Sequence, residues 1–197
     1  FIESRPELAD RVTVTTLRFR PGEDPAARYR ELRDLNPAIA GFSCYLWSLK
    51  ASLALAAMLK RDFPGVKTVL GGPEATPRAD ELLREHPEVD FVVRGEGEET
   101  LAELCHHILD GRTDFGNIAG LSFRNGAEIV HNVQRPVLWD LDKLPFPYPK
   151  GFELGRDDLI PIQSQRGCPY TCGFCFDNHG TPGVRYNSVE RAKKDLG

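Results

Sequence analysis

Residues 89–111 read VDFVVRGEGEETLAELCHHILDG, and this stretch decides the class of fold. Its first five residues are a short apolar run that ends near glycines, which is typical of a buried strand. Glu98 and Glu99 then occupy the first turn of a predicted helix, where acidic side chains suit the helix dipole, and Gly111 follows its end. The apolar residues at helical spacing are Leu101, Leu104, Cys105, Ile108 and Leu109. A buried strand is therefore followed directly by an amphipathic helix.

The same alternation extends toward the N-terminus. We predict strands over residues 11–19, 38–44, 66–70 and 89–93, from apolar and β-branched runs. We predict helices over residues 24–35, 47–62, 79–85 and 98–110. Asp24 and Pro25 are a good N-cap and first-turn pair for the first of these helices. Strands and helices of this length in alternation predict an α/β fold with a parallel sheet covered on both faces.

The pattern changes after the last of these helices. Residues 121–124 and 127–130 flank Asn125-Gly126, which predicts a β-hairpin with a two-residue turn. The prolines that follow predict a semi-rigid linker; they are Pro136, Pro145, Pro147 and Pro149. A short apolar strand is expected over residues 159–164, and a helix begins at 188–196.

Three segments follow from these patterns. Residues 1–133 form an α/β domain that ends in the hairpin, residues 134–157 are the linker, and residues 158–197 begin a second domain. Residues 1–9 resemble the end of a helix whose preceding strand is absent, and the last segment is too short for a whole domain. We therefore interpret the chain as a piece of a longer protein.

Composition excludes several classes of function. The 197 residues carry a formal charge of −4 and no basic stripe, which argues against a nucleic-acid surface. No apolar run is long enough to span a membrane. Five cysteines without an export signal argue against a disulfide framework and indicate a reducing compartment, hence the cytoplasm.

Small and flexible residues follow three of the predicted strands. Ser43 lies at the end of the strand predicted over 38–44, Gly71-Gly72 follow the strand over 66–70, and Gly95-Glu96-Gly97 follow the strand over 89–93. In an open parallel sheet, ligands bind beyond the carboxyl ends of the strands, and glycines let a ligand approach the backbone. Tight strand-to-helix turns are the alternative explanation. A G-x-G-x-x-G sequence is missing at the first helix, so a nicotinamide site is not indicated.

Three cysteines lie within eight residues: Cys168, Cys172 and Cys175. Three thiolates without an evident fourth ligand would hold a [4Fe–4S] cluster with one iron open to substrate. With His179 they could instead form a tetrahedral zinc site. A disulfide or ordinary packing is the remaining possibility, and spacing by itself does not choose among them.

These motifs together resemble those of a known family. Cys168-x-x-x-Cys172-x-Phe174-Cys175 resembles the radical S-adenosylmethionine (SAM) signature. Gly-Phe-Ser-Cys-Tyr-Leu-Trp, Leu-Gly-Gly-Pro-Glu and Val-Arg-Gly-Glu-Gly-Glu-Glu-Thr, all between residues 38 and 100, resemble the cobalamin-binding domain that precedes such enzymes. Residues 141–147 resemble the connector between the two domains, and residues 184–190 the stretch after the cluster loop.

The resemblance implies a Rossmann-like (flavodoxin-like) cobalamin-binding domain followed by the start of a radical SAM (β/α) barrel. It implies that Cys168, Cys172 and Cys175 hold a [4Fe–4S] cluster and that Phe174 lies beside the adenine of S-adenosylmethionine. The residues expected to contact cobalamin are Ser43, Tyr45, Trp47, Gly71, Gly72, Pro73, Gly95, Glu96 and Gly97.

The family's chemistry is reductive cleavage of S-adenosylmethionine to a 5′-deoxyadenosyl radical. That radical abstracts a hydrogen from an unreactive carbon of a small-molecule or peptide substrate. The outcome is methyl transfer, or ring-forming chemistry as in a magnesium-protoporphyrin monomethyl ester cyclase. An electron donor such as flavodoxin or ferredoxin is implied.

One departure from the family pattern leaves alternatives open. The Asp-x-His-x-x-Gly sequence that supplies a lower cobalt ligand is absent. A domain that keeps the fold without the cofactor, a cobalamin carrier or sensor, and a zinc-stabilised binding module are the alternatives. Trp47 could flank the corrin ring or pack under the sheet, and Cys44 and Cys105 are expected in the core. In this chain by itself, the cluster loop is not expected to form a complete site.

Overall fold

The computed structural model describes residues 1–18, 23–148, 161–170, 172–173, 175 and 183–196. The chain divides into two compact units, Ile2–Pro136 and Val137–Gly197. Within the described residues, no helix is long and apolar enough to cross a membrane.

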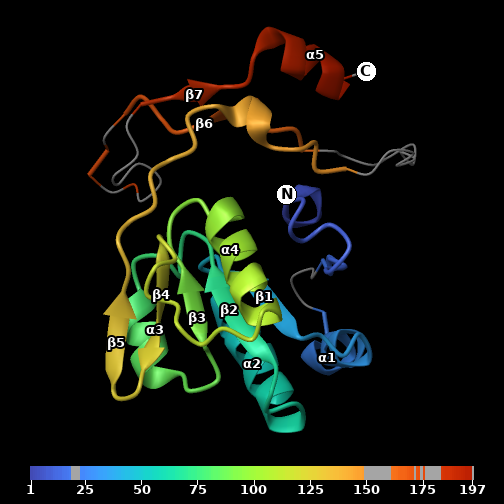
Figure 1. Ribbon diagram of the computed structural model, residues 1–197, viewed down its shortest axis with the longest axis vertical. Helices are drawn as coiled ribbons and strands as arrows, with labels where there is room; N and C mark the ends of the chain where they lie inside the picture. The colour runs from blue at the N-terminus through green and yellow to red at the C-terminus, as the bar shows by residue number, and fades with distance from the viewer. Residues whose placement is uncertain (19–22, 149–160, 171, 174, 176–182, 197) are drawn as a thin grey trace. The chain divides into compact units, whose positions relative to one another are not determined.

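The larger unit is built on a five-stranded sheet in the order β1-β2-β3-β4-β5 (Figure 1). Its strands are β1 (Ile39–Ser43), β2 (Lys67–Gly71), β3 (Phe91–Val93), β4 (Leu121–Asn125) and β5 (Glu128–His131). β1, β2 and β3 are parallel, whereas β4 and β5 run antiparallel to their neighbours. The predicted parallel sheet is confirmed, and the hairpin extends that same sheet.

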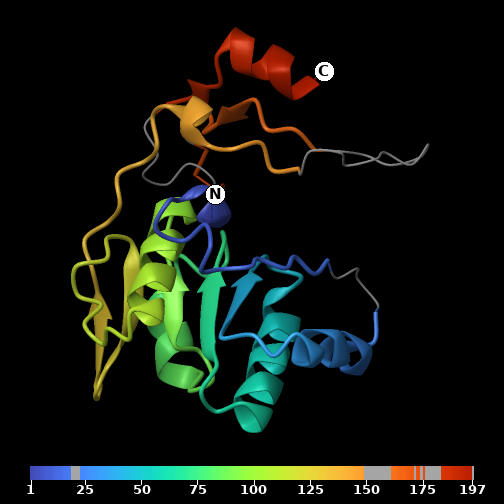
Figure 2. The same ribbon diagram turned by 45° about the vertical axis from the view of Figure 1, so that its right-hand side comes forward.

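Helices cover both faces of this sheet (Figure 2). They are α1 (Pro25–Asp34), α2 (Leu49–Asp62), α3 (Ala79–Glu85) and α4 (Glu98–Leu109), after a short 3₁₀ helix η1 (Ile2–Ser4). One core joins α1, α2 and α3 to the sheet through residues such as Leu59, Leu70 and Leu82, each 0% exposed. A second core joins α4 to the other face through Leu104 and Leu121. Burial on two faces explains why these strands have continuous apolar runs.

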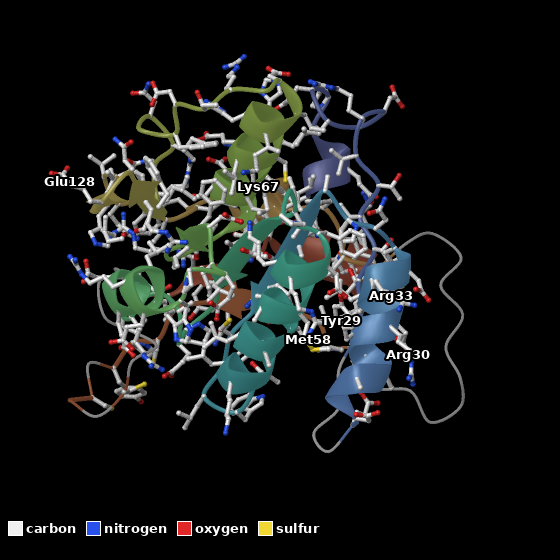
Figure 3. All side chains as sticks on the ribbon, turned by 90° about the horizontal axis from the view of Figure 1, so that it is seen from below. Tyr29, Arg30, Arg33, Met58, Lys67 and Glu128 are labelled. Atoms are coloured by element: carbon white, nitrogen blue, oxygen red, sulfur yellow. The ribbon has the colours of Figure 1, made fainter. Side chains whose placement is uncertain are left out.

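The first helix is positioned by its ends and by α2. The Asp24 side chain accepts a hydrogen bond from Ala26 N, so the predicted N-cap is confirmed. Tyr29 is 5% exposed and its hydroxyl donates to Met58 O at 3.2 Å. Figure 3 shows Tyr29 and Met58 side by side between the two helices.

Two predictions for this unit need correction. Residues 12–18 form no strand, although their β-branched sequence favours one. A strand needs a neighbour for its ladder, and Val14 N instead donates to the Glu3 carboxylate at 2.8 Å. The hairpin turn lies one residue later than predicted, because Asn125 pairs with Glu128 and leaves Gly126, at φ = +63°, inside the turn.

The smaller unit contains η2 (Leu141–Lys143), β6 (Gln165–Arg166), β7 (Arg185–Tyr186) and α5 (Val189–Leu196). β6 and β7 form an antiparallel pair. The strand predicted over 159–164 is wrong where the structure describes it, because residues 161–164 have no regular structure and pairing begins at Gln165. The side chain of Gln163 is instead used locally, since its Oε1 accepts from Arg166 Nε. The predicted helix after Ser188 is confirmed.

Candidate functional site

Three loops meet at the carboxyl edge of the parallel strands. Ser43 ends β1 opposite Gly71, which ends β2, and Arg94 follows β3. The predicted grouping of Ser43, Gly71-Gly72 and Gly95-Glu96-Gly97 at one sheet edge is therefore confirmed. Ser43 and Gly95 are exposed, whereas the other predicted residues of the second and third loops are half-buried, namely Gly71, Gly72, Pro73, Glu96 and Gly97.

The first two loops approach so closely that one position excludes any side chain. Cys44 N donates to Gly71 O at 2.7 Å, and Glu74 N donates to Cys44 O at 3.1 Å. Gly72 has φ = +101°, and a Cβ there would lie 2.7 Å from Cys44 O. This backbone conformation and this spacing both require glycine. Packing against Cys44 is thus sufficient to explain glycine at position 72, as in the alternative that these glycines serve tight strand-to-helix turns.

The second and third loops are joined through Thr76. Its hydroxyl accepts a hydrogen bond from Gly95 N at 3.2 Å and donates to Gly72 O at 3.1 Å. Gly95 has φ = +73° and is the residue at which the chain turns away from β3. Thr76 is not predictable from the sequence, because a contact across 19 residues leaves no local signal.

Arg94 holds the third loop to the hairpin. Its guanidinium donates to Asn132 O and, at 3.4 Å, to Gln134 Oε1. Its backbone N–H donates to Gly120 O at 2.8 Å. Burial lowers the pKa of Arg94, as expected for a cation removed from water. Arg94 therefore fixes the loop that begins at Gly95, a role that has no signal in the local sequence.

An exposed pair of aromatic rings follows β1. Tyr45 and Trp47 stack with ring centroids 5.0 Å apart and planes 9° apart, and Trp47 is 75% exposed. Packing of Trp47 under the sheet is thus excluded. Ser48 holds this loop, because its hydroxyl accepts from Tyr45 N at 2.9 Å and donates to Ser43 O at 3.1 Å. The two stacked rings give this loop a flat apolar surface that is exposed to solvent.

The two cysteines of this unit belong to the core, as predicted. Cys44 is 0% exposed and Cys105 is 4% exposed. Burial raises the pKa of both thiols, that of Cys105 to about 11. Neither thiol is activated for metal binding or nucleophilic attack.

The cysteine loop of the smaller unit begins two residues after β6. Cys168 and Cys175 are half-buried and Cys172 is exposed, and Cys175 N donates to Cys172 O at 3.0 Å. No disulfide joins the cysteines that the structure describes. Among those same residues, no three histidine, cysteine or acidic side chains gather as a metal site. Phe174 and His179 lie outside the described residues.

The chain matches a family model and several curated proteins. Residues 9–105 match the B12 binding domain. The chain is 32% identical over 160 residues to the cobalamin-dependent radical SAM methyltransferase TokK of Streptomyces tokunonensis, over 76% of this chain and 24% of that protein. It is 31% identical over 171 residues to the 2-(S-pantetheinyl)-carbapenam-3-carboxylate methyltransferase of Streptantibioticus cattleyicolor, over 82% of this chain and 25% of that protein. This chain is a relative of the cobalamin-dependent radical SAM enzymes. It spans about a quarter of the length of these curated relatives.

Other matches include a relative with a different named activity. An anaerobic magnesium-protoporphyrin IX monomethyl ester cyclase from Synechocystis is 33% identical over 130 residues, which cover 61% of this chain and 25% of that protein. The fold matches the structure of OxsB, a cobalamin-dependent S-adenosylmethionine radical enzyme, with aqua-cobalamin and S-adenosylmethionine bound. The TM-score is 0.70 at 21% identity, over 89% of this chain and 25% of that one.

Proposed function

We propose that this chain is the cobalamin-binding part, and the beginning of the catalytic barrel, of a cobalamin-dependent radical SAM enzyme. The observation that carries the proposal is the carboxyl edge of β1, β2 and β3. There, Gly72 and Gly95 let the loops after β1, β2 and β3 come together, and the exposed, stacked rings of Tyr45 and Trp47 follow β1. Such an edge is where open α/β sheets bind large cofactors.

In this proposal each loop makes a different kind of contact with cobalamin. Trp47 and Tyr45 offer an apolar surface to a flat macrocycle and exclude water from it, while Ser43 offers an exposed hydroxyl. The remaining contacts come from Gly71, Gly72, Pro73, Gly95, Glu96 and Gly97. Ser48, Thr76 and Arg94 hold these loops in register without touching the ligand. The absent Asp-x-His-x-x-Gly sequence means that no histidine of this chain is proposed as a lower cobalt ligand.

The thiolates of Cys168, Cys172 and Cys175 are proposed to hold a [4Fe–4S] cluster. Their residue type fits that cluster, which takes cysteine thiolates, and a set of three leaves one iron for S-adenosylmethionine. When bound, the cluster and cobalamin supply the electron for sulfonium cleavage and the carrier for a methyl group. The chain's own contribution is to place the cysteine loop and the sheet edge and to keep water away. Phe174 is proposed to lie beside the adenine.

The full reaction is proposed as reductive cleavage of S-adenosylmethionine followed by methyl transfer to an unactivated carbon or by ring-forming chemistry. The substrate is a small molecule or a peptide, and the electron donor is a flavodoxin or a ferredoxin of the cytoplasm. In this scheme residues 1–133 bind cobalamin, 134–157 connect, and 158–197 begin the barrel. The matches to methyltransferases and to cyclases support radical SAM chemistry. Methyl transfer and ring formation are both consistent with these matches.

Cobalamin binding can be measured with the two tryptophans of the chain, Trp47 and Trp139. Hydroxocobalamin is titrated into the protein, and binding is followed by equilibrium dialysis and by quenching of fluorescence. Trp47→Ala should weaken binding about tenfold to a hundredfold, as expected when a stacked ring is lost. Trp139→Ala is the matched control, because Trp139 is also exposed, at 63%. Equal affinity of both variants, or no binding by the wild type, would contradict the cobalamin assignment.

The cluster and the reaction need a longer test protein. Full-length material is reconstituted anaerobically, and iron, sulfide and zinc are counted per chain. We expect four irons per loop and loss of S-adenosylmethionine cleavage in Cys172→Ala. One zinc and no iron at this loop would support the zinc-binding module instead. Unchanged function of Cys172→Ala with bound cobalamin would support a carrier or sensor.

A further inference from the structure

The base of the cysteine loop is a very short ladder. β6 and β7 pair only Gln165 with Tyr186 and Arg166 with Arg185. Asn187 prolongs the pairing slightly, because its N–H donates to Ser164 O at 2.9 Å. A two-stranded ribbon of this size is marginal by itself in water, so another part of the unit must hold it.

Residues 138–144, which we name the connector segment, accept hydrogen bonds from the strand and helix that follow the loop. Arg185 is 4% exposed and donates from Nη1 to Leu138 O at 2.6 Å. Ser188 N donates to the Asp142 carboxylate at 2.9 Å. The connector segment is itself fixed by Leu141, which is 2% exposed.

Arg191, in α5, also donates hydrogen bonds to the connector segment. Its guanidinium donates to Asp142 O at 3.0 Å and to Leu144 O, and its Nε pairs with Asp195 at 2.7 Å. The side chains of Arg191 and Asp195 are 14% and 6% exposed, so this pair is shielded from water. Ser188 completes the helix start, because its hydroxyl accepts from Arg191 N at 3.0 Å. Hydrogen bonds from charged donors to carbonyls are stronger than neutral ones.

We propose that the connector segment is a latch that positions the three-cysteine loop, with Asp142 and Arg191 as its positioning residues. The proposal rests on the proposed function, since it gives the loop a cluster to hold. It assigns to this segment a role beyond linking two domains. Without the latch, the exit of the loop at 185–188 would keep the two-residue ladder and the hydrogen bonds of Asn187.

The first test measures the latch without any cofactor. Amide hydrogen exchange is recorded for Tyr186, Asn187 and Ser188 in the wild-type chain and in Arg191→Ala. Exchange at these amides should accelerate about tenfold to a hundredfold, because two charge-assisted hydrogen bonds are lost. Lys193→Ala, which removes an exposed cation from the same helix, should leave exchange unchanged. Equal exchange in Arg191→Ala and Lys193→Ala would overturn the latch.

The second test asks whether the latch places the loop for its cluster. In reconstituted full-length protein, Asp142→Ala should lower iron content and alter the electron paramagnetic resonance signal seen with S-adenosylmethionine. Asp142→Asn keeps an oxygen acceptor for Ser188 N and should restore both. A wild-type spectrum and full iron in Asp142→Ala would refute the positioning role. A wild type that binds no iron would refute the proposed function, and the exchange measurement would then decide the latch.

Discussion

Replacing Gly72 by alanine tests how tightly the sheet edge is built. Gly72 has φ = +101°, and an added Cβ would lie 2.7 Å from Cys44 O and 3.0 Å from Cys44 N. The left-handed conformation costs a residue with a Cβ about 1–2 kcal/mol. Forcing a methyl group into a packed site adds ~1–3 kcal/mol, and backbone atoms cannot rotate away as a side chain can. We expect Gly72→Ala to lower the free energy of unfolding by roughly 2–5 kcal/mol.

Alanine substitutions at two other glycines distinguish the cost of a positive φ from the cost of the steric clash with Cys44. Gly111 has φ = +67°, and among the described residues no heavy atom lies within 4 Å of the place that a Cβ would take, so Gly111→Ala should cost about 1–2 kcal/mol from strain only. Gly41 lies in β1 at an ordinary φ, again with no described atom within 4 Å. Gly41→Ala should therefore stay within about 1 kcal/mol of the wild type or stabilise it slightly.

Urea unfolding gives the comparison directly. It is followed by circular dichroism and by Trp47 fluorescence in a Trp139→Phe background, so that the larger unit is observed separately. The expected order of destabilisation is Gly72→Ala, then Gly111→Ala, then Gly41→Ala. If Gly72→Ala were no more destabilising than Gly111→Ala, the close approach of the Gly72 and Cys44 loops would be refuted.

Three further predictions concern buried groups. An aromatic disulfide reagent should modify the native thiols of the 168–175 loop quickly, and Cys44 and Cys105 only on unfolding; rapid native labelling of Cys105 would contradict their burial. The folded chain raises the pKa of Cys105 to about 11 and so holds its proton more tightly than the unfolded chain. The protonated Cys105 thiol therefore makes its full contribution to the free energy of unfolding below pH 9, and this contribution falls as the pH rises toward 11. The free energy of unfolding of Cys105→Ala, measured against pH, should lack this decline. Arg124→Lys should cost about 1–3 kcal/mol in urea unfolding, because the guanidinium donates to three carbonyls in α3 and the loop after it. Arg84→Lys, in an exposed pair, should cost less than about 1 kcal/mol, and equal losses would argue against the Arg124 contacts.

The helices and the parallel strands of this protein were predictable because their signals are local. The α4 periodicity agrees with the structure except at Leu109, which is 37% exposed, and the α3 boundaries, Ala79–Glu85, agree as well. So does the N-cap at Asp24. In each case the residues that decide the element lie within a few positions of one another, so hydrophobic period and capping chemistry are sufficient.

The failed predictions share a different cause. Residues 12–18 have the composition of a strand but form no strand in the structure. The strand predicted over 159–164 is replaced, in the residues that the structure describes, by pairing that begins at Gln165. β-propensity reports how a segment fits a sheet that is already present, and the segment itself does not specify its partner. The turn at Gly126 moved by one residue because the register Asn125 to Glu128 is set by both strands.

The sequence by itself determined the type of most elements, the glycines at the strand ends and the three cysteines with their spacing. Only the tertiary structure decided that Thr76 joins two of the loops, that Trp47 is exposed beside Tyr45, and that residues 138–144 accept hydrogen bonds from Arg185, Ser188 and Arg191. The physical reason is the distance along the chain. Local preferences are encoded in neighbouring residues, whereas hydrogen bonds across 19 to 49 residues exist only once packing has brought their partners together.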